Sequence, residues 1–156
     1  GLARFASLVT AAIGRDDTGL PGAGAAGGVG YAAQAVLGAA MRPGVELVLE
    51  LMGFEALCEG ASLVVTGEGS LDRQTLLGKT PAGVAKAARA HGIPVVAVCG
   101  RSLLAAEDVA ASGIAKVYAL TELEPDPAVC MGEADRLLRE LSAHMANEWL
   151  IRLGEL

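Results

Sequence analysis

The residues best suited to chemistry lie in one short polar segment, residues 66–75, whose sequence is TGEGSLDRQT. Its two carboxylates, Glu68 and Asp72, are close enough along the chain to hold Mg²⁺ or to accept a proton from a hydroxyl group. The glycines on either side of Glu68, Gly67 and Gly69, predict a sharp turn that leaves backbone N–H groups open to an anion. This combination favours the handling of a phosphate group.

A lysine follows the segment at a position that suits the same ligand. Lys79 comes just before a predicted helix over residues 80–90, where its ammonium group and the helix dipole would both attract phosphate. Carboxylates, open amides, a lysine and a helix start are the parts that phosphoryl transfer requires. The alternative is a solvated polar loop that an ion pair closes. Asp72 and Arg73 would supply one such pair, and Glu68 and Lys79 another.

The elements after residue 60 place this segment at one edge of a sheet. Unbroken apolar runs predict buried strands over residues 61–67, 93–100 and 115–120. Strands that are joined through crossover helices must be parallel, with right-handed connections. We therefore expect an α/β fold, a parallel sheet with flanking helices in the layered Rossmann or flavodoxin-like manner. The polar segment then begins at the carboxyl end of a strand, where open α/β sheets bind ligands.

Capping residues indicate where the helices of this part begin. Thr80 and Pro81 predict an N-cap and a first helical position, and Asp126 and Pro127 repeat the arrangement. Ser102 is expected to cap the helix between the second and third strands. The helices expected after residue 60 span residues 80–90, 102–111 and 127–152.

The first third of the chain is rich in alanine and glycine. Apolar residues at helical spacing predict helices over residues 2–12, 24–41 and 44–57. We expect residues 1–57 to be a helical segment of a partly missing second domain or its connection, and residues 58–156 to form the α/β domain. Apolar faces in the first part predict contact with a missing amino-terminal half or with a partner chain, a homo-oligomer included.

Composition and charge exclude several classes of protein. The 156 residues carry a net charge of −6 and their 12 basic residues are scattered, so no nucleic-acid partner is expected. No apolar run reaches the ~18–20 residues of a membrane helix, so no membrane partner is expected. Cys58, Cys99 and Cys130 lie far apart, which is typical of reduced thiols in the cytoplasm. His91 and His144 lack ligand partners at a useful spacing, so metal binding through them is not expected.

Two motifs are similar to nucleotide-binding signatures but lack the strand or the glycine that those signatures require. Residues 22–27, GAGAAG, match the dinucleotide-binding pattern, but RDDTGLP precedes them in place of the required strand. A dinucleotide-binding oxidoreductase is therefore a minor alternative. The same glycines suit a closely packed helix start, or a loop whose amides help to line an anion site. Gly78, Lys79 and Thr80 imitate the end of a P-loop, but Arg73 stands where that motif requires glycine.

Three longer stretches carry a resemblance to a known family. They are LPGAGAAGGVG (20–30), LVVTGEGSLDRQTLLGKTPAGVA (63–85) and the strand IPVVAVCG (93–100). They resemble the bacterial-type glycerate kinase family, whose pattern is close to PGAGAAGG followed by DLVITGEGxxDxQTxxGKxPxGVA. The match runs through almost the whole chain, and its second motif is long and specific. Ser62 replaces the usual aspartate just outside the strand.

The resemblance implies ATP-dependent, Mg²⁺-assisted phosphorylation of D-glycerate at a hydroxyl group. Asp72 would then be the general base or a metal ligand, Glu68 a metal ligand, and Lys79 the cation that neutralises the transferring phosphate. Gln74 would hydrogen-bond to the substrate or the nucleotide. The residues expected to bind substrate or nucleotide are Gly24, Gly67, Gly69, Ser70, Gln74 and Thr75.

The chain is shorter than the members of that family, which resemble chains more than twice as long with two α/β domains around a cleft. Their amino-terminal half opens with a strand and a loop close to DSFKG, and this sequence has no such stretch. We therefore expect the carboxyl-terminal portion of a glycerate kinase, with an incomplete active site when isolated. The alternative is a non-catalytic module that binds a nucleotide or an organic acid weakly, or only supports an interface.

Overall fold

The computed structural model describes residues 1–76 and 78–154. It divides into two compact units, Gly1–Pro43 and Gly44–Leu156. Composition placed the division after residue 57, whereas the contacts place it before the helices of residues 44–58. Those helices therefore belong to the unit that carries the sheet. No helix in the described ranges combines the length and the apolar character that crossing a bilayer requires.

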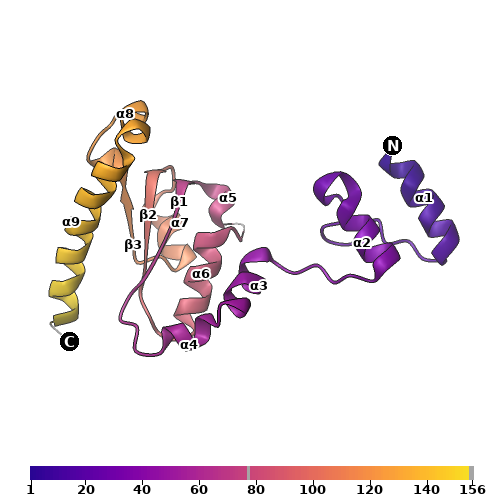
Figure 1. Ribbon diagram of the computed structural model, residues 1–156, viewed down its shortest axis with the longest axis horizontal. Coiled ribbons are helices and arrows are strands. Elements are labelled where there is room, and N and C mark those ends of the chain that lie inside the picture. Colours follow the sequence, from indigo (N-terminus) through magenta and orange to yellow (C-terminus); the bar gives the residue numbers. More distant parts are fainter. Residues whose placement is uncertain (77, 155–156) are drawn as a thin grey trace. The chain divides into compact units, whose positions relative to one another are not determined.

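The first unit is helical and has a small core of its own. Its elements are α1 (Leu2–Ile13), the short 3₁₀ helix η1 (Ala25–Gly28) and α2 (Val29–Leu37) (Figure 1). The core consists of Ala6, Ala23, Tyr31 and Ala35. The hydroxyl of Tyr31 donates to the carbonyl oxygen of Ala6 at 3.2 Å, so the polar end of this buried ring is satisfied.

The glycine-rich stretch of this unit does not begin one long helix over residues 24–41, as its spacing predicted. Ala26, Gly27 and Gly28 have φ angles of 49°, 66° and 99°, in the left-handed region, and α2 begins only after them. Gly30 lets the stretch pack closely, because a side chain there would overlap the carbonyl oxygen of Gly22. Residues 1–43 contain no strand, so the context of a dinucleotide-binding motif is not present.

The second unit is an α/β fold, as predicted. Three parallel strands lie in the order β1-β2-β3, and helices cover both faces of the sheet (Figure 1). Its elements are α3 (Gly44–Leu51), α4 (Phe54–Cys58), β1 (Val64–Leu71), α5 (Arg73–Leu76), α6 (Thr80–Arg89), β2 (Val95–Ser102), α7 (Ala106–Ser112), β3 (Lys116–Ala119), η2 (Leu120–Glu122), α8 (Pro127–Gly132) and α9 (Ala134–Gly154).

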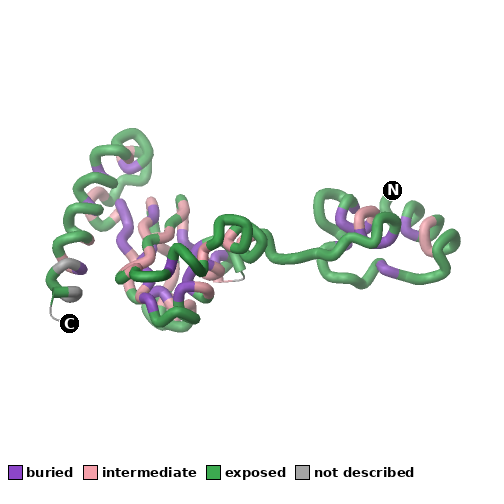
Figure 2. Tube along the Cα trace, turned by 60° about the horizontal axis from the view of Figure 1, so that its bottom comes forward, coloured by how far each residue is buried: buried purple, intermediate pink, exposed green. Residues whose placement is uncertain are grey.

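Side chains that alternate along the strands build two cores, one on each face of the sheet. Val95, Ala97 and Cys99 of β2 pack with Ala85 and Ala88 of α6. On the other face, Val96, Val98 and Tyr118 of the strands pack with residues of η2, α8 and α9, which are Leu120, Cys130, Leu137, Leu141 and Trp149. Figure 2 shows the buried residues of this unit on the strands and the adjacent helices. The continuous apolar runs of the sequence follow from burial on both faces.

Several helix limits differ from those that the sequence predicted. The helix expected over residues 44–57 breaks at Gly53, whose φ of 65° is left-handed. The final helix divides at Glu133 into α8 and α9. Ser102 ends β2 instead of capping a helix, and Lys79 takes the N-cap position of α6 that Thr80 was expected to hold. The prediction for Asp126 is confirmed, because its Oδ1 accepts from a backbone N–H in the first turn of α8 at 2.8 Å.

Candidate active site

The segment that was predicted to be a polar loop is largely a strand. β1 continues past Gly67 to Leu71 and pairs in parallel with residues 95–102 of β2. Gly67 permits this pairing, because a side chain there would overlap the carbonyl oxygen of Val98. Neither Gly67 nor Gly69 has a positive φ, so the predicted sharp turn is wrong. The first of these glycines serves the close approach of two strands.

Thr75 connects the two residues that carry the carboxylates. It lies in α5, just after β1, and its exposed fraction is 0%. Its hydroxyl donates a hydrogen bond to Oε1 of Glu68 and accepts one from the backbone N–H of Asp72 at 3.1 Å. The sequence predicted that Thr75 would contact a ligand, whereas in the structure its buried hydroxyl donates one hydrogen bond and accepts one inside the protein. Thr75 thereby ties the middle of β1 to the start of α5.

Asp72 is the N-cap of α5. Its Oδ1 accepts hydrogen bonds from the backbone N–H groups of Gln74 at 2.8 Å and Thr75 at 3.3 Å. Aspartate is among the residues that helix N-caps prefer, since its oxygen satisfies N–H groups that have no partner within the helix. No described residue donates a hydrogen bond to the second oxygen of Asp72 or of Glu68. Each carboxylate therefore has one oxygen held by the protein and one available to a ligand.

The remaining predicted residues of this unit lie around the same end of the sheet. Oγ of Ser70 accepts a hydrogen bond from Nε of Arg101 at 3.2 Å, across the paired ends of β1 and β2. Gln74 is exposed on the first turn of α5. Lys79 is exposed at the N-cap of α6, a helix of 10 residues, so its ammonium group stands at the positive end of the helix dipole. Gly24 belongs to the first unit, where it precedes η1.

The ion pairs of the solvated-loop alternative do not form within residues 1–76 and 78–154. The structure pairs neither Asp72 with Arg73 nor Glu68 with Lys79. Hydrogen bonds from Thr75 and from the first turn of α5 orient the two carboxylates instead. The described residues therefore leave Lys79 available to an anionic ligand.

A cavity of about 520 Å³ opens on the α8–α9 side of the sheet, at the carboxyl ends of the strands. Glu68 and Gly69 line it together with Arg101 of β2. Apolar residues of η2, α8 and α9 form much of its wall, among them Leu120, Pro127, Met131 and Leu138. Open α/β sheets bind their ligands at this end of the strands, so the cavity and the polar segment share one candidate site.

Cys99 also lines this cavity, and its chemistry is that of a neutral core residue. Burial raises the pKa of its thiol to about 11, and the charges of Glu122 and Glu68 act in the same direction, against a hydrogen bond with the backbone of Leu71. The thiolate is the nucleophilic form of cysteine. At neutral pH Cys99 is therefore protonated and packs as a small apolar side chain, as the sequence indicated.

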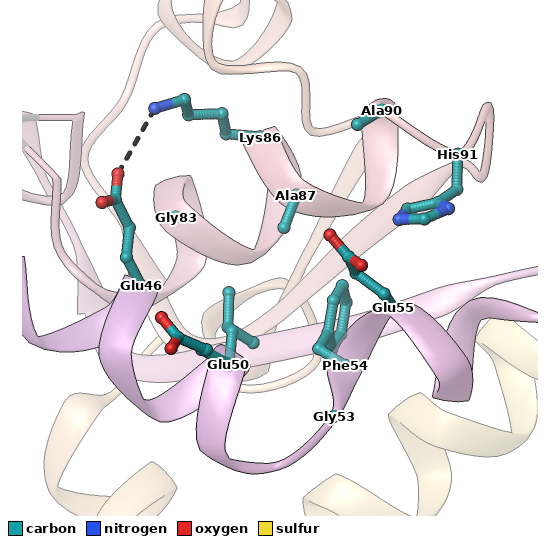
Figure 3. Close-up of a pocket in the computed structure, with 11 residues that line it drawn as sticks. Glu46, Glu50, Gly53, Phe54, Glu55, Gly83, Lys86, Ala87, Ala90 and His91 are labelled. Carbon is teal, nitrogen blue, oxygen red and sulfur yellow. Dashed lines mark hydrogen bonds and ion pairs between the residues drawn. The ribbon is translucent and has the colours of Figure 1, made fainter.

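A second cavity, of about 570 Å³, lies between α3–α4 and α6 and contains none of the predicted site residues. Figure 3 shows Glu46 and Lys86 facing each other across one end of it, and Glu55 and His91 near the other end. Nζ of Lys86 lies 3.4 Å from Oε1 of Glu46. Gly83 lets α3 approach α6, because a side chain there would overlap Val45. This cavity lacks the strand ends and the convergent polar segment, so the first cavity is the candidate active site.

Sequence reasoning missed the contribution of Arg101 and of the cavity walls. Arg101 follows an apolar run and a glycine, so only its position after a strand pointed to the site. Met131 and Leu138 carry no local signal, because their role follows from the packing of α8 and α9 against the sheet. Within the described ranges, no three His, Cys, Asp or Glu side chains gather as a preformed metal site.

Comparison with known proteins decides the family. The profile described as "Glycerate kinase family" matches residues 1–150. The chain belongs to the glycerate kinase family. The TGEGSLDRQT segment, the parallel sheet and the cavity are thus parts of a glycerate kinase fold, and the resemblance of the sequence to this family is confirmed.

Individual relatives agree with this assignment. The chain is 41% identical over 145 residues to a glycerate kinase of Halalkalibacterium halodurans, which covers 93% of this chain and 38% of that protein. It is 40% identical over 99 residues to the glycerate 2-kinase of Escherichia coli K12, covering 64% of this chain and 26% of the other. A solved structure described as a glycerate kinase 2 of Salmonella typhimurium LT2 superposes with a TM-score of 0.56 at 38% identity, over 75% of this chain and 28% of that one.

Proposed function

We propose that this glycerate kinase family chain takes part in the ATP-dependent phosphorylation of D-glycerate at a hydroxyl group. The observation that carries the proposal is the pair of carboxylates at the carboxyl end of β1, which Thr75 and the first turn of α5 hold in place. The chain spans 38% of the length of its Halalkalibacterium relative. We therefore propose the activity of a whole glycerate kinase for the protein to which these residues belong.

Asp72 has the features of a general base or a metal ligand. A base must reach the hydroxyl proton of the substrate with an oxygen that the protein does not occupy. Oδ1 of Asp72 is occupied by two backbone N–H groups, and this fixes the direction of the other oxygen. Glycerate bound beside Asp72 would donate its hydroxyl proton to that oxygen as the hydroxyl oxygen bonds to the terminal phosphorus of ATP, and the bond from that phosphorus to the leaving ADP breaks.

Glu68 and Asp72 also fit Mg²⁺. This ion is usually held by one or two carboxylates together with water and substrate phosphates, and a preformed cage of protein ligands is not required. One free oxygen on each of two neighbouring carboxylates satisfies that need. When bound, Mg²⁺ would neutralise charge on the phosphates.

Lys79 and Gln74 would act on the transferring group and on the ligands around it. The ammonium group of Lys79 and the N-terminus of α6 both favour an anion, and phosphoryl transfer is accelerated mainly by positioning and charge neutralisation. Gln74 is exposed on the first turn of α5 and can donate or accept a hydrogen bond.

The three buried, unpaired cysteines of the described chain suit a reducing compartment, so we propose a cytoplasmic location.

A coupled assay of ADP release with D-glycerate tests the proposal. Asp72→Asn should lower kcat by about 10²-fold or more, because asparagine retains the helix cap but cannot take a proton. Asp126→Asn is the matched control, since Asp126 caps α8 in the same way outside the site. Lys79→Met should also lower kcat. Wild-type turnover by the Asp72→Asn protein would refute the assigned roles.

A second candidate function is non-catalytic ligand binding, because the chain covers only part of the length of its relative. A chain with 38% of its relative's length can retain ligand binding without turnover, as a module that binds a nucleotide or an organic acid. Calorimetric titration with Mg-ATP and with D-glycerate separates the two possibilities. Binding without glycerate-dependent release of ADP would favour the non-catalytic module.

A further inference from the structure

The cavity of about 520 Å³ has a floor of bare backbone. Gly69 of β1 and Gly100 of β2 both line it, next to the apolar walls from η2, α8 and α9. A side chain on Gly100 would press against the carbonyl oxygen of Gly69 at 2.7 Å, so the fold itself requires that glycine. The two strands therefore present peptide planes to the cavity where side chains would otherwise fill it.

Gly69 differs from its neighbours because the fold does not require it. Its φ is not positive, and a Cβ added there meets no atom within 4 Å. Gly67, two residues earlier, has no room for a side chain. A glycine inside a strand weakens the strand and often marks a place where a ligand approaches the backbone closely. Gly69 lines the cavity, so a ligand that approaches the backbone there would explain the glycine.

The walls indicate the chemical class of that ligand. Leu120, Pro127, Met131 and Leu138 are apolar, and Met131 is 78% exposed at the cavity although it is a large hydrophobic residue. D-Glycerate carries a carboxylate and two hydroxyl groups on three carbons, so it gains little from such walls. A nucleobase has the flat apolar faces that fit between bare peptide planes and aliphatic side chains.

The polar part of the lining suits the remainder of the same ligand. Arg101 is exposed and uses Nε to bind Ser70, which leaves the other N–H donors of its guanidinium group for an anion. Glu68 and Gly69 belong both to this cavity and to the segment that leads to Asp72. A nucleoside in the cavity would thus have its phosphates beside the carboxylates of the proposed active site.

We propose that this cavity binds the nucleoside part of the phosphoryl donor, with the base on the Gly69–Gly100 floor and Arg101 on a phosphate. The proposal rests on the proposed kinase function, and it assigns the nucleotide and the glycerate to different parts of the site. It also gives Gly69, Arg101 and Met131 roles in nucleotide binding.

Displacement of a fluorescent N-methylanthraniloyl-ADP probe from the protein tests this assignment, with adenosine and inorganic tripolyphosphate as separate competitors. Gly69→Val fills the open space above the floor, and Met131→Glu places a charge on the apolar wall. Each should weaken displacement by adenosine about tenfold, and each should change displacement by tripolyphosphate much less. Met52→Glu is the matched control, because Met52 is 62% exposed and lies outside the cavity.

The outcomes separate this inference from the kinase proposal. Adenosine that fails to displace the probe, a probe that does not bind, or equal adenosine affinity in the wild-type and Met131→Glu proteins would each overturn the cavity assignment. Circular dichroism reports whether Gly69→Val is folded; if it is not, Met131→Glu decides the matter. Cavity-dependent adenosine binding without glycerate-dependent turnover would support the nucleoside site and count against the kinase proposal alone.

Discussion

Replacement of Thr75 with valine should lower the free energy of unfolding of the second unit by about 3 kcal/mol. Valine has nearly the same shape, and Thr75 is completely buried, so the change creates almost no cavity. It removes the hydrogen bond to the carboxylate of Glu68, a type worth about 1.5–3 kcal/mol. It also leaves the N–H of Asp72 without its partner, at a cost of about 1–3 kcal/mol. The two losses overlap, because α5 can shift once the hydroxyl is gone.

Urea unfolding followed by tryptophan fluorescence measures this loss. The chain has a single tryptophan, Trp149, which is 7% exposed in the core of the same unit. Thr75→Ser is the matched control, since it keeps the hydroxyl and deletes one buried methyl group, at a cost of about 1 kcal/mol. If the valine variant were as stable as the serine variant, the hydroxyl would not connect β1 with α5. A double-mutant cycle with Glu68→Gln isolates the coupling between the two side chains.

Three further predictions concern the same unit. Gly67→Ala should cost about 1–3 kcal/mol in urea unfolding, because its methyl group would overlap the carbonyl oxygen of Val98, whereas Gly69→Ala should be near neutral; equal losses would refute the strand contact. The pKa of Cys99 is about 11 in the folded protein, against an ordinary 9.0. The free energy of unfolding should therefore fall by on the order of 2 kcal/mol as the pH rises from about 9 to about 11. The same pH change should destabilise the Cys99→Ala protein less. Asp126→Ala should lower stability by about 1 kcal/mol and Asp126→Asn by much less, as measured by thermal melts; equal losses would show that the cap is not responsible.

The sequence correctly predicted the elements that depend on residues close to them along the chain. The three strands follow from unbroken apolar runs, because burial on both faces leaves no polar position to interrupt them. The cap at Asp126 follows from its own side chain and the proline after it. The carboxyl end of a parallel strand is a ligand site by topology, so Glu68 and Asp72 were predicted to lie together without knowledge of their contacts.

The remaining features depend on partners that are distant in sequence. Gly67 and Glu68 are poor strand residues, and only pairing with β2 makes them part of β1. Thr75 is polar and lies in the polar segment, so its residue type suggests ligand binding, but packing beneath β1 buries it. Ala26 takes a left-handed φ of 49° that spacing cannot predict, because alanine ordinarily favours helix.

The continuation of β1 through the polar segment limits how this part of the chain can change length. Val64 and Leu71 both pack into the core beneath α6 although they are seven positions apart, so the alternation of faces shifts once along β1. Gly69 has no partner in the register, and the register of β1 against β2 is the same before and after it. A deletion of one residue between Val64 and Glu68 would turn the Glu68 carboxylate away from α5. The side chain of an adjacent residue of β1 would then face Thr75. Insertions and deletions are therefore excluded from β1, and sequence variation there must proceed by substitution.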